Sequence, residues 1–214
     1  KFQTQVSQRI IRGGRVLLVV DGPPIDQEAF IYLDRRRYAD DERARLAHPG
    51  AKHIVCEHCR VIERGSSSDN RVLESVWLPK ATSVCDDTFW CCRRLLHVSL
   101  PVVESVGKNA FMGCYGLRSV SLIAQELGDC ALSQCVRLRT VSLPCARFAS
   151  TRLFYYSYRL ESVSMPSATE VHEGAFTYCS KLTEVSLPAV RDVGELAFQY
   201  CSYLEAVSLP NLDS

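Results

Sequence analysis

The strongest constraint on the fold of this chain is a sequence repeat with a period of 22 residues, which begins at residue 73. Each unit opens with the pattern Leu-x-x-Val-x-Leu-Pro, and one unit is a residue shorter than the others. The leading leucines are Leu73, Leu95, Leu117, Leu138, Leu160, Leu182 and Leu204. The closing prolines are Pro79, Pro101, Pro144, Pro166, Pro188 and Pro210, with Ile123 in the third unit instead. Six whole units and part of a seventh cover 73–214, which is typical of a solenoid.

The second half of each unit carries a Phe-x-x-Cys block. Full copies stand at 89–92, 111–114, 176–179 and 198–201, and imperfect copies at 132–135 and 154–157. In the first half, the valine and leucine two residues apart share one face of a short strand, and proline ends that strand because it has no N–H to donate. Units stacked about 4.8 Å apart bury these faces in one core. We therefore predict an α/β repeat solenoid with a curved parallel sheet on one face and irregular or short-helical return segments.

The most regular units read Val-Gly-x-x-Ala-Phe-x-x-Cys, at 106–114 and 193–201. This pattern resembles the BspA-like subfamily of leucine-rich repeat proteins. The resemblance implies a horseshoe-like or ramp-like solenoid that binds proteins or surfaces and has no catalytic centre, and members are often surface or adhesion proteins. The third unit lacks the proline and one residue, and the fourth lacks the cysteine. We expect irregular curvature there.

The residues before the repeats predict a small α/β N-terminal cap. Residues 15–20 form an apolar run typical of a strand, and 24–47 have the charged pattern of a helix, with Pro24 in its first turn. Residues 51–72 match the repeat poorly and suggest a degenerate capping unit. The expected division is 1–50 as a strand–helix cap, 51–72 as a capping repeat and 73–214 as the solenoid.

The cysteine pattern indicates core packing rather than a cofactor or metal site. The chain has eleven cysteines, an odd number, so intramolecular disulfides cannot use all of them. Five cysteines recur at the repeat period, where a small buried thiol suits the core: Cys92, Cys114, Cys135, Cys179 and Cys201. The weak metal candidate is a cluster of Cys56, Cys59, His53 and His58, which lacks a second Cys-x-x-Cys to complete a zinc site. We expect no metal and no cofactor.

Charge and motifs argue against several classes of function. Twenty-five basic residues against 24 acidic ones leave a net charge of +1, which gives no general attraction to nucleic acid. The nucleophile elbow, the phosphate-binding loop and the His-Glu-x-x-His zinc motif are all absent from the sequence. The longest strongly apolar run, 16–20, is far shorter than the roughly 20 residues of a membrane span. The sequence therefore predicts a protein that is not an enzyme and has no membrane span.

Two surfaces could bind a protein partner. The open sheet face is rich in serine, and its only large recognition side chains are Trp77 and His97. The other surface surrounds the Phe-x-x-Cys turns and is rich in tyrosine, with a basic column beside it. Its candidate residues are Tyr155, Tyr156, Tyr158, Tyr178, Tyr200, Tyr203, Arg94, Arg137, Arg159 and Lys181. Tyrosine and arginine are enriched at protein interfaces, so this surface suits recognition, although half-buried rings with long charged neighbours would look similar.

These observations predict a non-catalytic protein-interaction scaffold, with other proteins as its partners. The free-thiol-rich core favours a structural subunit of an intracellular assembly, cytoplasmic or organellar. Two alternatives stay open: a cell-surface adhesin or antigen, as the resemblance suggests, and an RNA- or ribonucleoprotein-associated subunit that uses the basic column. The chain stops in mid-unit after Pro210, so we expect a partner or further residues to cover that end of the core.

Overall fold

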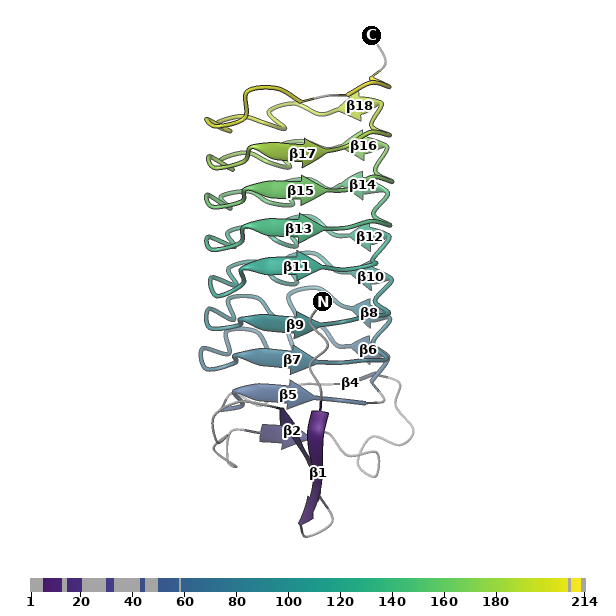
Figure 1. Cartoon of the computed structure of the whole chain (residues 1–214), viewed down its shortest axis with the longest axis vertical. Coiled ribbons are helices and arrows are strands. Elements are labelled where there is room, and N and C mark those ends of the chain that lie inside the picture. Colours follow the sequence, from purple (N-terminus) through teal and green to yellow (C-terminus); the bar gives the residue numbers. More distant parts are fainter. Residues whose placement is uncertain are drawn as a thin grey trace.

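The computed structural model describes the backbone of 6–12, 15–20, 30–32 and 43–44, and all atoms of 50–57, 59–207 and 209–212. These residues form strands and turns and contain no helix. Figure 1 shows the turns of the chain stacked as rungs along the long axis, most of them with one strand on either side. The repeat solenoid expected from the sequence is therefore confirmed.

The front wall of the solenoid consists of three-residue strands, of which those after residue 73 come from the Leu-x-x-Val-x-Leu-Pro motif. They are β3 (Phe30–Tyr32), β5 (His53–Val55), β7 (Ser75–Trp77), β9 (His97–Ser99), β11 (Ser119–Ser121), β13 (Thr140–Ser142), β15 (Ser162–Ser164) and β17 (Glu184–Ser186). They pair in parallel, with Val141 of β13 beside Val163 of β15. In this register, equivalent residues of successive repeats lie side by side in neighbouring strands, so the valines share one inward face.

The back wall consists of two-residue strands, of which those after residue 73 come from the second half of each unit. They are β4 (Arg43–Ala44), β6 (Val61–Ile62), β8 (Ser83–Val84), β10 (Ser105–Val106), β12 (Glu126–Leu127), β14 (Phe148–Ala149), β16 (Glu170–Val171) and β18 (Asp192–Val193). These strands also pair in parallel. The core between the walls holds the leading leucines, the strand valines, the phenylalanines and the periodic cysteines.

The segments that return the chain to the front wall are turns, so the expected short helices are wrong. Each segment has left-handed residues two positions before and two positions after the phenylalanine position. Before it stand Asp87, Asn109, Cys130, Arg152, Gly174 and Leu196, and after it Cys91, Gly113, Gln134, Tyr156, Tyr178 and Tyr200. A helix needs consecutive residues with negative φ, which these positions interrupt. Alternate N–H groups of the segment bond to the next rung, as Phe89 N–H does to the Ala110 carbonyl at 2.8 Å, while those between them bond to a carbonyl three residues earlier, as Trp90 N–H does to Asp87 at 3.1 Å.

The N-terminal residues also differ from the sequence-based expectation. The predicted strand at 15–20 is confirmed as β2 (Arg15–Val20), which pairs antiparallel with β1 (Val6–Arg12). A continuous helix over 24–47 is wrong, because β3 and β4 lie within that range, and its other residues lie outside the described part of the chain. β3 pairs in parallel with β5, and β4 with β6. The charged pattern of 24–47 led to the wrong prediction because charged residues can flank short paired strands as well as line the face of a helix.

Both walls are interrupted at the third unit. This is the unit that lacks the proline and one residue, where we expected an irregularity. The front wall divides into β3-β5-β7-β9 and β11-β13-β15-β17, and the back wall into β4-β6-β8-β10-β12 and β14-β16-β18. Figure 1 shows β9 and β11 more widely spaced than the other front strands. The third unit thus bonds to later rungs through β11 and to earlier rungs through β12. We call the break between β9 and β11 the front seam.

Candidate functional site

The phenylalanine of each Phe-x-x-Cys block anchors the turn that carries the candidate site. The rings of Phe89, Phe111, Phe154 and Phe176 are buried, and they stack in pairs on neighbouring rungs, with centroids 5.3 Å apart for Phe89 and Phe111 and 5.2 Å for Phe154 and Phe176. The N–H of each of these residues donates to an alanine carbonyl of the next rung, as from Phe154 to Ala175 at 2.8 Å. Neighbouring turns are therefore held one rung apart by both their backbones and their core side chains.

The periodic cysteines are buried core residues, as the sequence analysis expected. Their thiols donate to the carbonyl of a residue 24 or 25 positions earlier, as from Cys114 Sγ to Phe89 at 3.2 Å and from Cys179 Sγ to Phe154 at 3.3 Å. Ser157 takes the place of cysteine in the fourth unit, and its hydroxyl makes the same bond to Leu132. Burial raises the pKa of Cys92 and of Cys135 to about 12, because the thiolate would be desolvated. These thiols are protonated at neutral pH and are therefore poor nucleophiles.

Six tyrosines gather on the outer side of the last three complete turns, and we call them the tyrosine edge. They are Tyr155, Tyr156, Tyr158, Tyr178, Tyr200 and Tyr203. The rings of Tyr156 and Tyr178 stack with centroids 4.5 Å apart, and those of Tyr178 and Tyr200 do so at the same distance. Tyr155 packs edge-on against Tyr156 at 4.2 Å. The exposed fractions of Tyr158, Tyr200 and Tyr203 are 44%, 55% and 54%, so the edge presents large aromatic surface to solvent.

The stacked tyrosines stand at left-handed backbone positions. The φ angles of Tyr156, Tyr178 and Tyr200 are 60°, 63° and 60°. Such angles are uncommon for a bulky side chain and unfavourable by roughly 1–2 kcal/mol per residue. The same position in earlier rungs holds smaller or polar residues, namely Asp69, Cys91, Gly113 and Gln134. The fold does not require tyrosine there, and the ring stacking that partly offsets the strain is peculiar to these three turns.

Cations border the tyrosine edge. The Lys181 ammonium lies 3.8 Å from the ring centroid of Tyr203, and the Arg152 guanidinium 5.9 Å from that of Tyr155. The Lys181 ammonium lowers the pKa of Tyr203 by hydrogen bonding to its phenolate and attracting it. Desolvation and the neighbouring phenols raise the pKa of Tyr178. The edge thus combines neutral phenols with cations already seated on aromatic faces.

The basic column is only partly continuous. Arg94, Arg137, Arg159 and Lys181 are exposed, as placed by the sequence repeat. Gly116 interrupts the column in the second unit, and the Arg94 guanidinium is paired with Glu74 at 3.1 Å. Lys181 is engaged with Tyr203. The column therefore offers less free positive charge than its sequence suggests.

Sequence reasoning missed Arg152, which lies beside Tyr155 and also pairs with Glu173 at 3.0 Å. It also missed the left-handed backbone beneath the stacked rings. A signal for this backbone was present in the sequence. Gly113 stands at the repeat position that Tyr156 and Tyr178 occupy in later units, and Asn109 stands at the position that Arg152 occupies. Glycine and asparagine are the residues that most readily adopt positive φ.

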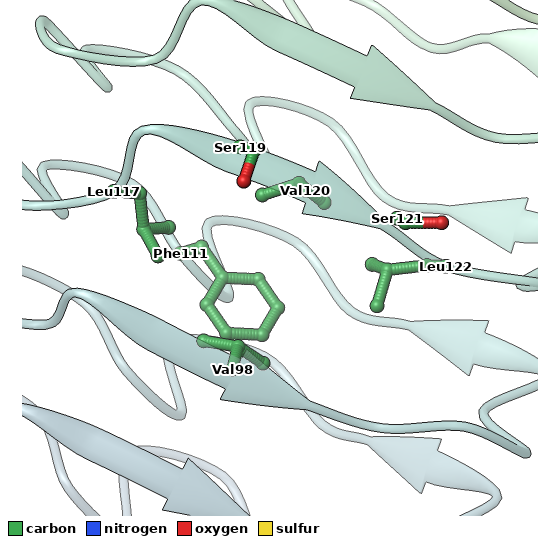
Figure 2. Close-up of a pocket in the computed structure, with 7 residues that line it drawn as sticks. All are labelled: Val98, Phe111, Leu117, Ser119, Val120, Ser121 and Leu122. Atoms are coloured by element: carbon green, nitrogen blue, oxygen red, sulfur yellow. The ribbon is translucent and has the colours of Figure 1, made fainter. Parts of the chain in front are cut away.

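The front wall forms a second, separate surface. Trp77 is half-buried on β7 and His97 is exposed on β9, the neighbouring strand. At the front seam, Figure 2 shows the Phe111 ring lying behind the gap, beside Val98 and near Val120 of β11. The cavity there has a volume of about 10 Å³, which accommodates about one water molecule. The front wall contributes Trp77 and His97, and the cavity at its seam is too small for a larger ligand.

A shallow groove of about 720 Å³ crosses the back wall over β8, β10 and β12. Its charged side chains are of both signs, among them Asp86, Lys108 and Asp129. The Asp86 carboxylate accepts a hydrogen bond from the backbone N–H of Lys108 at 2.8 Å, so it is used within the fold. The mixed charge gives the groove no strong preference for an anionic or a cationic ligand.

The weak metal candidate takes a different form in the structure. Cys56 and Cys59 are joined in a disulfide, so neither sulfur is available as a thiolate ligand. His53 Nδ1 lies 2.7 Å from the Ser75 hydroxyl, and burial lowers the pKa of His53. His58 lies outside the described residues. Within the described part of the chain, no group of three or more His, Cys, Asp or Glu side chains is arranged to hold a metal ion.

Comparison with protein families gives one match, to the BspA type leucine-rich repeat region. Six copies of this repeat match within 54–149 and 82–205, which together include most of the chain. No enzyme family is indicated. No curated protein matches the sequence.

Solved structures of bacterial leucine-rich repeat proteins share the fold. A T. pallidum leucine-rich repeat protein is 23% identical with a TM-score of 0.69, covering 72% of this chain and 78% of that one. A leucine-rich cell surface protein from Faecalibacterium prausnitzii is 24% identical with a TM-score of 0.62, covering 77% of this chain but only 44% of that one. A leucine-rich repeat protein from Eubacterium ventriosum is 18% identical with a TM-score of 0.55, covering 76% of this chain and 56% of that one. The chain thus spans about half the length of the latter two proteins.

Proposed function

Because this chain belongs to the BspA-type leucine-rich repeat family, we propose that it is a non-catalytic protein-binding scaffold whose recognition surface is the tyrosine edge. The observation that carries this proposal is the cluster of six tyrosines, half-buried or exposed, bordered by Arg152, Arg159 and Lys181. Tyrosine supplies large contact area with few rotatable bonds, so its burial against a partner loses little conformational entropy. The charges of the back-wall groove and the small cavity of the front seam offer no comparable surface.

The cell surface is the better-supported location. The sequence alone favours an intracellular assembly, but the F. prausnitzii protein with the same fold is a cell surface protein. We propose that this chain also acts at the cell surface, where the edge binds a protein of the surroundings. In the described residues, none of the segments is a helix long and apolar enough to cross a membrane. Contact with RNA lacks support, since the basic column is interrupted and two of its four cations are engaged.

The test compares capture of surface proteins by two matched double variants. Tyr200→Asn with Tyr203→Ser removes the two most exposed rings of the edge, and asparagine tolerates the left-handed backbone at position 200. Trp77→Ser with His97→Ser removes the recognition residues of the front wall. We expect a partner captured by the wild type to be lost with the first variant and kept with the second, at equal thermal stability. Loss of the partner with the second variant alone would place the binding site on the front wall. Failure of the wild type and of both variants to capture a partner would contradict a binding role.

A further inference from the structure

The three stacked rings of the tyrosine edge form a row of phenols that is fixed by the backbone. The N–H of Tyr156 donates to the Thr177 carbonyl at 3.1 Å, and the N–H of Tyr178 to the Gln199 carbonyl at 2.9 Å. Each tyrosine is therefore bonded to the residue that precedes the next tyrosine of the stack. Because neighbouring rungs cannot slide past one another without breaking these bonds, the side chains keep the same neighbours.

The rings are close enough for a covalent bond between them. Both centroid separations are 4.5 Å, and the ring planes are inclined by 15° for Tyr156 and Tyr178 and by 18° for Tyr178 and Tyr200. In two phenols joined at their ortho carbons, the ring centres are separated by one C–C bond and two ring radii, which is about the separation of these stacked rings. The centres can therefore stay in place while the rings tilt about their side-chain bonds. The outermost ring, that of Tyr200, is 55% exposed and accessible to an oxidant.

We propose that Tyr156, Tyr178 and Tyr200 are a site of oxidative cross-linking, at which Tyr178 forms a dityrosine bond with Tyr156 or with Tyr200. The oxidant is hydrogen peroxide used by a haem peroxidase. It removes one electron and one proton from each of two phenols, and the two phenoxyl radicals couple through their ortho carbons. Each ortho hydrogen then moves to the phenolic oxygen of its ring. The chain loses two hydrogen atoms per cross-link, and one hydrogen peroxide is reduced to two molecules of water.

Such a bond would join two rungs covalently on the face that carries the proposed recognition surface. Because it links residues 22 apart, it would close a loop and restrict the unfolded chain, and so stabilise the last turns against unfolding. The proposal does not depend on the protein-binding role of the edge. Cross-linking is measured on the purified chain without a partner, so the two proposals can fail separately.

The experiment treats the purified chain with a haem peroxidase and hydrogen peroxide and then maps tryptic peptides by mass spectrometry. Tryptic cleavage yields peptides 153–159, 160–181 and 192–214, and Tyr178 is the single tyrosine of 160–181. We expect monomeric protein in which 160–181 is joined to 153–159 or to 192–214 with the loss of two hydrogen atoms. Dityrosine fluorescence should rise in parallel.

Three variants make the result specific. Tyr178→Phe keeps the stacked ring but cannot form a phenoxyl radical, so both cross-links should be lost. Tyr156→Phe should leave the link between 160–181 and 192–214. Tyr115→Phe is the control, since Tyr115 is contacted by Arg93 and lies in none of the tyrosine pairs of the described residues. Intramolecular dityrosine that survives Tyr178→Phe, equal yields from the folded and the urea-unfolded chain, or cross-linked dimers alone would each overturn the proposal.

Discussion

Single residues set the spacing between rungs in this solenoid. Where the chain leaves β10, β12 and β18, a glycine lets its backbone approach the neighbouring rung closely. A Cβ on Gly107 would lie 2.5 Å from the backbone nitrogen of Asp86, and one on Gly194 would lie 2.7 Å from that of Glu173. The hydroxyl of Ser157 shows the complementary role of a side chain, because it takes over the hydrogen bond that cysteine makes in five other rungs.

Gly107→Ala should lower the free energy of unfolding by about 1–3 kcal/mol, because backbone atoms of the neighbouring rung must shift to admit the methyl group. Gly50→Ala is the matched control, since no atom lies within 4 Å of a Cβ placed there. Urea unfolding of both variants measures the difference. Equal stability of Gly107→Ala and the wild type would show that the rungs approach less closely at this position.

Ser157→Cys should leave the free energy of unfolding within about 0.5 kcal/mol of the wild type, because a thiol fills the same position in neighbouring rungs. Ser157→Ala should reduce it by about 1 kcal/mol, since the hydrogen bond to the buried Leu132 carbonyl is lost. Thermal and urea unfolding of the pair distinguish these effects. A larger loss with cysteine than with alanine would contradict the equivalence of the two side chains.

At the scale of elements, the third unit is the point at which the two walls part. Its front strand β11 bonds forward to β13, whereas its back strand β12 bonds backward to β10. In regular rungs, the residue after the front strand donates to the next rung, as Leu78 does to Ser99 and Leu143 to Ser164. The described residues contain no such bond from Leu100 across the front seam to Ser121.

Amide hydrogen exchange should therefore be faster for Leu100 than for the equivalent amides of Leu78 and Leu143. Those amides are closed by inter-rung bonds of 3.1 and 2.9 Å, whereas the Leu100 amide can exchange without opening one. Exchange followed by NMR, residue by residue, measures the difference. Protection of Leu100 equal to that of Leu143 would show that β9 and β11 pair in solution.

At the scale of the whole molecule, nine free thiols and one disulfide share the chain. Most of the periodic thiols lie deep in the common core, whereas Cys145 is exposed. The core thus depends on reduced cysteine as a small packing residue that also donates a hydrogen bond. The protonation and the reactivity of these thiols therefore report whether the whole solenoid is folded.

Thiol labelling should proceed in two phases. In the native protein, Cys145 should react first, while the five periodic cysteines are protected by burial. Unfolding in the absence of a reductant should expose nine reactive thiols, and reduction should release the remaining two of the eleven. Quantitative labelling with a thiol reagent and mass spectrometry gives both numbers. Eleven reactive thiols without reduction would contradict the Cys56–Cys59 disulfide.

Stability should fall in alkali. Burial raises the thiol pKa of Cys92 and of Cys135 from 9.0 to about 12, so the folded state holds these protons more tightly than the unfolded state. Their contribution is complete below about pH 9 and is lost as the pH rises towards 12. Urea unfolding at a series of pH values measures the decline. Cys135→Ser should make it shallower, because serine does not titrate in this range; an unchanged slope would contradict this origin.

The sequence by itself determined the solenoid, the parallel register and the buried columns. Burial of apolar side chains is fixed by a local pattern, and that pattern recurs every 22 residues from Leu73 onward. It also placed Tyr156, Tyr178 and Tyr200 in one column. Only the tertiary structure decided that the return segments are left-handed turns, that Cys56 pairs with Cys59, and that residues within 24–47 form strands. The turns and the strands depend on hydrogen bonds with another rung, whose energy a local pattern of residues does not contain, and the disulfide depends on how the backbone places its two sulfurs. The ring stacking at the tyrosine edge has the same origin, because it follows from a backbone conformation that neighbouring rungs impose on three tyrosines.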